Sequence, residues 1–479
     1  MKLSKHIFII AVLFLWCLIT ILRVSFHQAW FDEAHAYMLA QNYSVIELIS
    51  KMNDEGHLLV WYLLLMPFAK LKLWYPYPMQ ILNWLFVLVS LIVLCKKAPF
   101  GNWTKFAITL SYPFLAQLPV LARCYAVGVM LMCLLVVMYK NSVKHPVAYS
   151  SVLILCGNTS LMALFGVFPL GLLFGYDLIK SALNDEVKKR DFIISSAICI
   201  FGAVLILWQL LGAASYNVPT NMHDFGVQFS KYFYLLSAKY LLVNVFNELI
   251  VAALLIYTVI ILFIKDRRIL FFWLFTFVSM LYCFLFRYAG ASQHYVFFPI
   301  YIMFAYWMLF DKCEKPLKSF IVAEVLLFLM FVGQIFSPAL KNDAFFGFKA
   351  KTMADKILTI DNIENSRIIL FLPKAQAVIP YMENENTEFY LYNWALPATN
   401  CENFFNFLSF TSDIMYISPT WLNRSLAYDK NNYILIPAVV RGETFRLEDK
   451  NFIINFIPVL DLPNNHKLFK IEKTDKMKL

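Results

Sequence analysis

Charged residues are scarce in this chain. They make up 15% of its 479 residues, against about 25% in an ordinary soluble domain. Hydrophobic residues make up 61%, and the mean hydropathy is +0.64. This composition excludes an ordinary soluble globular protein and predicts a polytopic α-helical membrane protein.

The cysteines of the chain indicate neither disulfide bonds nor a metal site. The nine cysteines are scattered, mostly inside apolar runs, and the part after residue 340 contains only Cys401. This spacing yields neither a set of disulfides nor a CxxC metal site. The same C-terminal part lacks a GxGxxG motif, a P-loop and a nucleophile elbow, so the sequence predicts no chemistry for it.

The net charge of +10 does not indicate a nucleic-acid partner. Residues 1–340 contain 25 Lys and Arg against 15 Asp and Glu, whereas residues 341–479 contain 16 of each class. The whole basic excess therefore lies in the apolar part, where it is explained by the enrichment of Lys and Arg in the cytoplasmic loops of membrane proteins.

A helix needs about 20 apolar residues to cross a bilayer, and on this basis we expect about eleven spans. They are 6–24, 78–95, 104–119, 121–139, 146–160, 161–179, 191–213, 243–264, 269–287, 293–310 and 319–338. The first is interpreted as a retained helix, because no small-residue cleavage site precedes Arg23. Residues 146–179 are split into two short helices that turn at Gly157, Asn158 and Thr159. A single span there would invert the orientation of all later spans.

With a cytoplasmic N-terminus, 17 of the 25 basic residues in 1–340 lie in cytoplasmic loops. The first loop (about 25–77) and the tail from 341 are then extracytoplasmic. In the loop, Ser44 and Glu47 form a capping box, and the apolar run 58–68 predicts a helix too short to span. In the tail, β-rich runs begin at 367, 388, 413, 432, 452 and 466 and alternate with helical stretches near 350–359 and 419–429. We therefore predict a transmembrane domain over 1–340 and a soluble α/β domain over 341–479.

The first loop holds an unusual density of acids and histidines for so apolar a chain. Asp32, Glu33 and His35 follow the first span closely, and a carboxylate at the boundary of a membrane can accept a proton or bind a metal ion. Asp32 and His35 would share a helix face, which permits shared metal ligation. The alternatives are a solvated helix start for the acids and simple packing for His35.

A second group in the same loop contains Asp54, Glu55 and His57. Two such groups could converge on one site, and the alternative is a polar turn that enters the membrane interface. Three more polar residues are predicted near the outer ends of later spans, namely Arg123, Arg287 and His294. An arginine there suits a lipid phosphate, to which it offers two parallel donors. The alternative role of such an arginine is to anchor the helix end at the membrane interface.

Several of these segments resemble the bacterial GT-C superfamily of glycosyltransferases, which includes the aminoarabinose transferases and the protein O-mannosyltransferases. WFDEAHAYMLAQN at 30–42 and DEGHLLVWYLLLMPFAKL at 54–71 resemble the first periplasmic loop of that family. LARCYAVGVML at 121–131 and RYAGASQHYVFFPIYIMFAYW at 287–307 resemble two of its helix starts. The resemblance covers most of 25–310, with leucines at 58 and 59 in place of the prolines many relatives have.

The resemblance implies an inverting transfer of a sugar from a polyprenyl phosphate to a lipid, glycan or protein acceptor, on the outer face of a bacterial inner membrane. It makes Asp32 the catalytic base, or the residue that holds a metal ion in its place, with Glu33 beside it. His35, Asp54, Glu55, His57, Arg123, Arg287 and His294 are then expected to bind substrates. Any divalent metal ion would be held by Asp32, Glu33 and His35. Two rivals stay open, a glycan polymerase or ligase with a diphosphate-linked donor and a transporter or flippase, although a transporter would place its charged residues within the spans.

Overall fold

The computed structural model describes residues 2–52, 55, 57–213, 256–262, 264–286, 292–312, 318–335, 349–370, 373–382, 387–391, 396–397, 422, 426–427, 429–437, 445–448, 452–463 and 466–475. Its contacts divide the chain into two compact units. Unit 1 consists of Met1–Ser25, Ile49–Trp61 and Gln80–Asp343, and unit 2 consists of Phe26–Leu48, Tyr62–Met79 and Ala344–Leu479.

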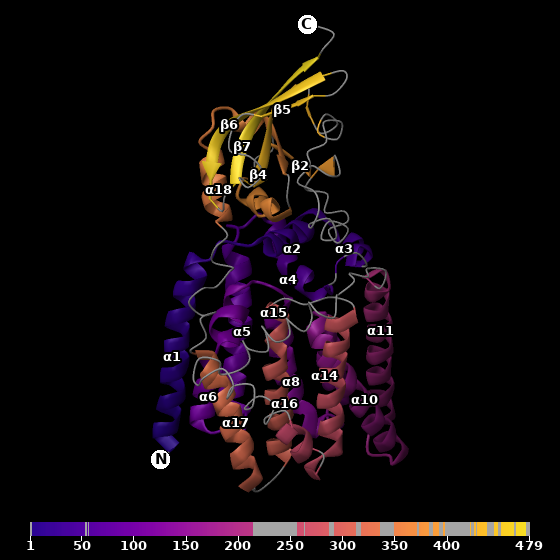
Figure 1. The fold of residues 1–479 in the computed structure, drawn as a ribbon. Coiled ribbons are helices and arrows are strands. Elements are labelled where there is room, and N and C mark those ends of the chain that lie inside the picture. Colours follow the sequence, from indigo (N-terminus) through magenta and orange to yellow (C-terminus); the bar gives the residue numbers. More distant parts are fainter. Residues whose placement is uncertain are drawn as a thin grey trace. The chain divides into compact units, whose positions relative to one another are not determined.

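Unit 1 is a bundle of apolar helices (Figure 1). Within the described residues, six helices are long and apolar enough to cross a membrane. They are α1 (Lys2–Phe26), α5 (Tyr77–Lys97), α8 (Cys124–Met138) with the 3-10 turn that continues it to Asn141, α10 (Leu161–Leu183), α11 (Lys189–Ala213) and α14 (Arg267–Phe286). Large apolar side chains of α1 and α11 are exposed, with Ile10 at 66% and Leu211 at 71%. These helices are those of a membrane-associated protein, as the composition predicts.

The predicted turn inside 146–179 is confirmed. Helix α9 (Pro146–Gly157) ends there and α10 begins at Leu161. The N-cap of α10 is Ser160, whose Oγ accepts a hydrogen bond from the amide of Ala163 at 3.2 Å. Helix α9 has 12 residues, fewer than a straight crossing of the bilayer requires.

The predicted continuous helix over 104–119 is wrong. The chain forms three short pieces instead, namely α6 (Asn102–Thr109), a π-helical turn at Pro113–Gln117 and α7 (Leu118–Val120). Pro113 and Pro119 lack the amide hydrogens that a continuous helix would use. The late apolar segments form α15 (Ser292–Tyr295), α16 (Phe297–Lys312) and α17 (Lys318–Ile335). Most of the predicted span 243–264 lies outside the described residues.

Polar side chains join these pieces inside the bundle. Trp16 Nε1 of α1 donates to the carbonyl of Phe114 at 2.6 Å, which satisfies a backbone acceptor in the broken segment. The Glu324 carboxylate of α17 accepts from the Gly101 amide and from the Thr104 hydroxyl, and so caps the N-terminus of α6. The broken segment is therefore anchored to helices on either side of it in the sequence.

Unit 2 contains one sheet, whose described strands are in the order β3-β2-β1-β4-β7-β6-β5. The strands are β1 (Ser366–Leu370), β2 (Glu388–Leu391), β3 (Leu396–Pro397), β4 (Asn431–Pro437), β5 (Phe445–Glu448), β6 (Phe452–Leu462) and β7 (His466–Asp475). β1 is parallel to both β2 and β4, and the other pairs are antiparallel. Apolar side chains of β1, β4, β6 and β7 form the core with Leu422 and Leu426.

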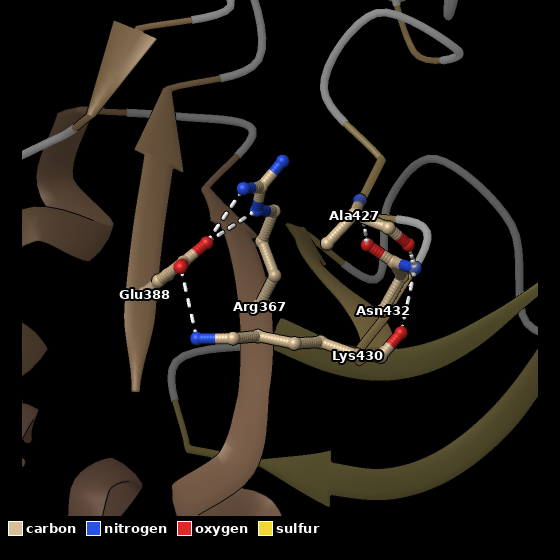
Figure 2. Close-up of polar contacts among 5 residues, drawn as sticks. All are labelled: Arg367, Glu388, Ala427, Lys430 and Asn432. Carbon is tan, nitrogen blue, oxygen red and sulfur yellow. Dashed lines mark hydrogen bonds and ion pairs between the residues drawn. The ribbon is translucent and has the colours of Figure 1, made fainter. Parts of the chain in front are cut away.

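The sheet confirms five of the six predicted strands, and the run at 413 lies outside the described residues. Helix α18 (Ala350–Ile357) confirms the first helical stretch; of the second, 419–429, only 422, 426–427 and 429 are described. Figure 2 shows how charge joins the starts of the parallel strands. Glu388 of β2 accepts from Arg367 of β1 at 2.6 and 2.8 Å, and from Lys430 before β4 at 2.8 Å.

Two segments of the predicted first loop belong to unit 2 together with the tail. The loop contains α2 (Phe31–Asn42), α3 (Val45–Lys51) and α4 (Val60–Lys70). The capping box is confirmed, because the Ser44 amide donates to Glu47 at 2.7 Å and the Glu47 amide donates to the Ser44 hydroxyl at 3.3 Å. The short helix expected at 58–68 is confirmed as α4. A tail that folds alone stays a prediction.

Candidate functional site

The first candidate residues lie at the start of α2. Trp30 is the N-cap in an extended conformation, and Asp32 and Glu33 fall in the first turn, where carboxylates favour the helix dipole. Glu33 is fully buried. Its Oε2 accepts from the Trp30 amide at 2.8 Å and from His27 Nε2, also at 2.8 Å. Glu33 therefore fixes the entry of the chain into α2.

Asp32 differs from its neighbours in exposure. Glu33 and His35 are buried, whereas Asp32 is half-buried. The alternative interpretation of the two acids as a solvated helix start therefore fits Asp32 and does not fit the buried Glu33. Of the three predicted residues on α2, only Asp32 is partly accessible to solvent, as a base that contacts a substrate must be.

The second predicted group is placed in part. Asp54 lies outside the described residues, Glu55 is buried, and His57 is half-buried. The chain after His57 is held by backbone hydrogen bonds in unit 1. The Leu59 amide donates to Gln209 Oε1 of α11 at 2.9 Å, and the Val60 amide donates to the Asn158 carbonyl at 3.1 Å.

Asn158 and Gln209 are themselves connected. Gln209 Nε2 donates to Asn158 Oδ1 at 2.9 Å, and both side chains are buried. The turn between α9 and α10 therefore does more than reverse the chain, because it holds the segment that carries His57. These two positioning residues are absent from the sequence-based set.

His57 meets a second group at the start of α8. The Arg123 guanidinium donates to His57 Nε2. A guanidinium has donors only, so the lone pair of Nε2 faces Arg123 and the ring proton is on Nδ1. Nδ1 lies 3.6 Å from Cys124 Sγ. A hydrogen bond from Arg123 therefore requires the neutral imidazole with its proton on Nδ1.

Tyr125 extends this group to α15. Its hydroxyl lies 2.7 Å from His294 Nε2, and its ring packs edge-on against the rings of both His57 and His294. Arg123, Tyr125 and His294 are buried. Three residues predicted from distant segments, His57, Arg123 and His294, are thus brought together. We call His57, Arg123, Tyr125 and His294 the His-Arg-Tyr cluster.

Tyr125 is the member that the sequence analysis missed. It lies two residues after Arg123, inside the quoted segment LARCYAVGVML. An aromatic residue at a helix start is common in membrane proteins, so its identity alone carries little signal. Arg287, which was predicted to bind substrate together with Arg123 and His294, lies outside the described residues.

The candidate metal ligands do not converge. In the described part of the chain, no three His, Cys, Asp or Glu side chains come together in an arrangement that could hold a metal ion. Asp32, Glu33 and His35 are all described, and Glu33 already pairs with His27. The residues that are present on α2 therefore do not fit a three-ligand metal site.

Comparisons with known proteins add no identity. A scan against protein-family models gave no match, and a search of curated proteins gave no significant match.

Proposed function

We propose that the protein is a membrane glycosyltransferase that moves a sugar from a polyprenyl-phosphate donor to a hydroxyl of a lipid, glycan or protein acceptor. The observation that carries the proposal is the arrangement at the start of α2. Glu33 holds the turn rigidly from the buried side, and Asp32 remains half-exposed beside it. A carboxylate on a fixed helix start is a suitable general base.

The reaction is a single displacement at the anomeric carbon. The acceptor oxygen forms the new bond to that carbon, the bond from the carbon to the phosphate oxygen breaks, and polyprenyl phosphate leaves with the electron pair. Asp32 accepts the proton of the acceptor hydroxyl, which makes the oxygen a better nucleophile as the bond forms. Attack opposite the leaving group inverts the configuration.

The His-Arg-Tyr cluster is proposed to bind the phosphate of the donor. A guanidinium is the side chain best suited to two phosphate oxygens. The buried position of Arg123 strengthens its interaction with an anion. The contact with neutral His57 limits the directions in which the guanidinium can point.

In the membrane, we propose that the chain crosses eleven times, and that the broken segment 102–120 and the short helix α9 are two of these crossings. The N-terminus is then cytoplasmic, and the first loop and the tail are extracytoplasmic, in a bacterial inner membrane. The support is the distribution of Lys and Arg among the loops together with the turn between α9 and α10. Reporter fusions at 140–145 and 180–190 should report the cytoplasm, and fusions after 345 the outside. A C-terminus in the cytoplasm would contradict this topology.

The decisive test uses purified protein in detergent, where no gradient exists and vectorial transport cannot produce a signal. The wild type, supplied with donor and acceptor, should release free polyprenyl phosphate. Asp32→Asn should lower turnover by roughly a hundredfold to ten-thousandfold. Glu47→Gln is the matched control, because Glu47 is an exposed acid in the same loop, and its turnover should equal that of the wild type.

Two outcomes would contradict the proposal. Consumption of a diphosphate-linked donor alone would identify a polymerase or ligase. Movement of a lipid-linked sugar across vesicles, without consumption of any donor in detergent, would identify a transporter. Full turnover in Asp32→Asn would contradict only the role of Asp32.

A further inference from the structure

The chain that leads into α2 is held by residues of the tail, more than 300 positions away. Gln28 Nε2 donates to the Thr352 hydroxyl of α18 at 3.1 Å, and the Thr352 amide donates to Gln28 Oε1 at 3.3 Å. The Ala29 amide donates to the Tyr381 hydroxyl at 3.0 Å. All of these residues belong to unit 2.

These contacts act on the first turn of α2. Ala29 is fully buried, so its amide would have no water to replace Tyr381. The next residue, Trp30, is the N-cap whose amide binds Glu33. Thr352, Tyr381 and Glu33 therefore hold three consecutive residues on the approach to Asp32, namely Gln28, Ala29 and Trp30.

Aromatic packing supports the same segment from a second direction. The ring of Tyr381 lies edge-on to Tyr75, with centroids 4.9 Å apart, and Tyr75 packs on Tyr37 of α2 at 4.7 Å. Burial raises the pKa of both Tyr75 and Tyr381 above their ordinary values. Both hydroxyls therefore stay protonated, and the cluster carries no phenolate charge near Glu33.

The position of this contact in the sheet is informative. Tyr381 ends the 3-10 helix η7 (Pro373–Tyr381), which follows the carboxyl end of the parallel strand β1, and α2 packs against η7. In open α/β sheets, this edge is where ligands usually bind. Here a segment of the same chain, the start of α2, packs against the element that follows it.

We infer that Thr352 and Tyr381 are positioning residues for the first turn of α2, so that the tail is part of the machinery that orients Asp32. This inference rests on the proposed function for its catalytic consequence. Its structural half, that the tail fixes 27–33, does not depend on any activity.

The test uses the full-length chain in detergent and two variants, Tyr381→Phe and Thr352→Val. Tyr381→Phe keeps the ring but removes the acceptor of the Ala29 amide. Hydrogen exchange over 27–33, followed by mass spectrometry, should accelerate by roughly five- to a hundredfold, because a buried donor loses its partner. Thr352→Val should accelerate exchange less, since Gln28 can still accept from the residue 352 amide.

Thr359→Val is the matched control. Its hydroxyl donates to Lys356, at the end of the same helix, and is exposed. It should leave exchange over 27–33 unchanged. In the transfer assay, Tyr381→Phe should lower kcat while the KM for the donor stays constant, because the variant disturbs the base and not the donor site.

Wild-type exchange over 27–33 in both variants would overturn the inference, whatever the enzyme does. Faster exchange with an unchanged kcat would also overturn it, since the function of Asp32 would then not depend on the contacts of Thr352 and Tyr381. If the wild type transfers no sugar, the proposed function fails, and the exchange result still decides whether the tail fixes this segment.

Discussion

Glu33 and Glu47 occupy the same position in two neighbouring helices, yet we expect very different effects when they are replaced. Each is the third residue of its helix, and each carboxylate accepts the amide of the N-cap residue, at 2.8 Å in α2 and 2.7 Å in α3. The difference is burial, because Glu33 is 0% exposed whereas Glu47 is open to solvent. The hydrogen bond from Ser44 lowers the pKa of Glu47.

The magnitude for Glu33 follows from its two donors. Glu33→Ala removes the partner of the Trp30 amide and breaks the contact with the buried His27 ring. Hydrogen bonds to charged groups contribute about 1.5–3 kcal/mol each, and removal of one partner of a buried pair costs about 3–5 kcal/mol. We expect local destabilisation of α2 by about 3–5 kcal/mol. Glu33→Gln keeps an acceptor and should cost about half as much.

Limited proteolysis measures this local stability directly. Cleavage within 31–42 requires that α2 opens, because most of its residues are buried, and the rate follows the population of the open form when closing is fast. A loss of 3–5 kcal/mol corresponds to cleavage about a hundredfold faster, or more. Glu47→Ala should accelerate cleavage in α3 far less, since water replaces the lost carboxylate there.

Equal acceleration at the two sites would refute this reasoning, because it would mean that burial does not govern the cost of losing the cap. Wild-type cleavage in Glu33→Ala would refute it too. Asp32→Asn provides a further control, since a half-exposed side chain should contribute little to the stability of α2.

Three further predictions address other parts of the chain. Arg123→Lys should raise the KM for the polyprenyl-phosphate donor in the detergent assay, because a point charge does not replace two parallel donors; an unchanged KM would make Arg123 an interface anchor. Gln209→Ala should cost about 1–3 kcal/mol in reversible unfolding in detergent, because the buried Leu59 amide loses its acceptor; an unchanged stability would exclude this network. The hydrogen bonds from Lys430 and Arg367 lower the pKa of Glu388 below its ordinary value of 4.5. The ion pairs of Glu388 therefore stabilise the folded tail fully above pH 4.5, and this stabilisation is lost as the pH falls through the lowered pKa. Glu388→Gln should therefore flatten the rise in tail cleavage by pepsin on acidification, and an identical pH profile would contradict the role of the ion pairs.

Much of the fold was predictable because its signals are local. The turn at 157–159 was found from Gly157 and Asn158 between apolar runs, and β1, β4 and β6 from runs of apolar and β-branched residues. β5 was missed, since Phe445–Glu448 is only four residues long and two of them are charged. The break at Pro113 and Pro119 was available from the sequence, but apolar length outweighed it in the prediction of a span.

The candidate site was predictable in its members and not in its contacts. His57 was chosen from a dense group of acids and histidines in the first loop, and Arg123 and His294 from the outer ends of spans, where an arginine suits a lipid phosphate. No pattern in the sequence pairs these residues, because 66 positions separate His57 from Arg123 and 169 separate Tyr125 from His294. Gln209 lies inside an apolar helix, where an isolated amide is as typical of helix packing as of a loop contact.

The contacts at the start of α2 also could not be predicted from the sequence, because they join the residues that are farthest apart in the chain among those discussed. From their spacing alone, the acids at 32 and 33 are equivalent, since both are carboxylates in the first turn of one helix, and only the family resemblance favours Asp32. They become different only because His27 and the Trp30 amide bind Glu33, while Gln28 and Ala29 are bound by Thr352 and Tyr381. The partners of Gln28 and Ala29 lie 324 and 352 positions away. Which carboxylate is buried and which is half-exposed is therefore decided by packing within unit 2, and a motif of adjacent acids identifies the turn without identifying the residue.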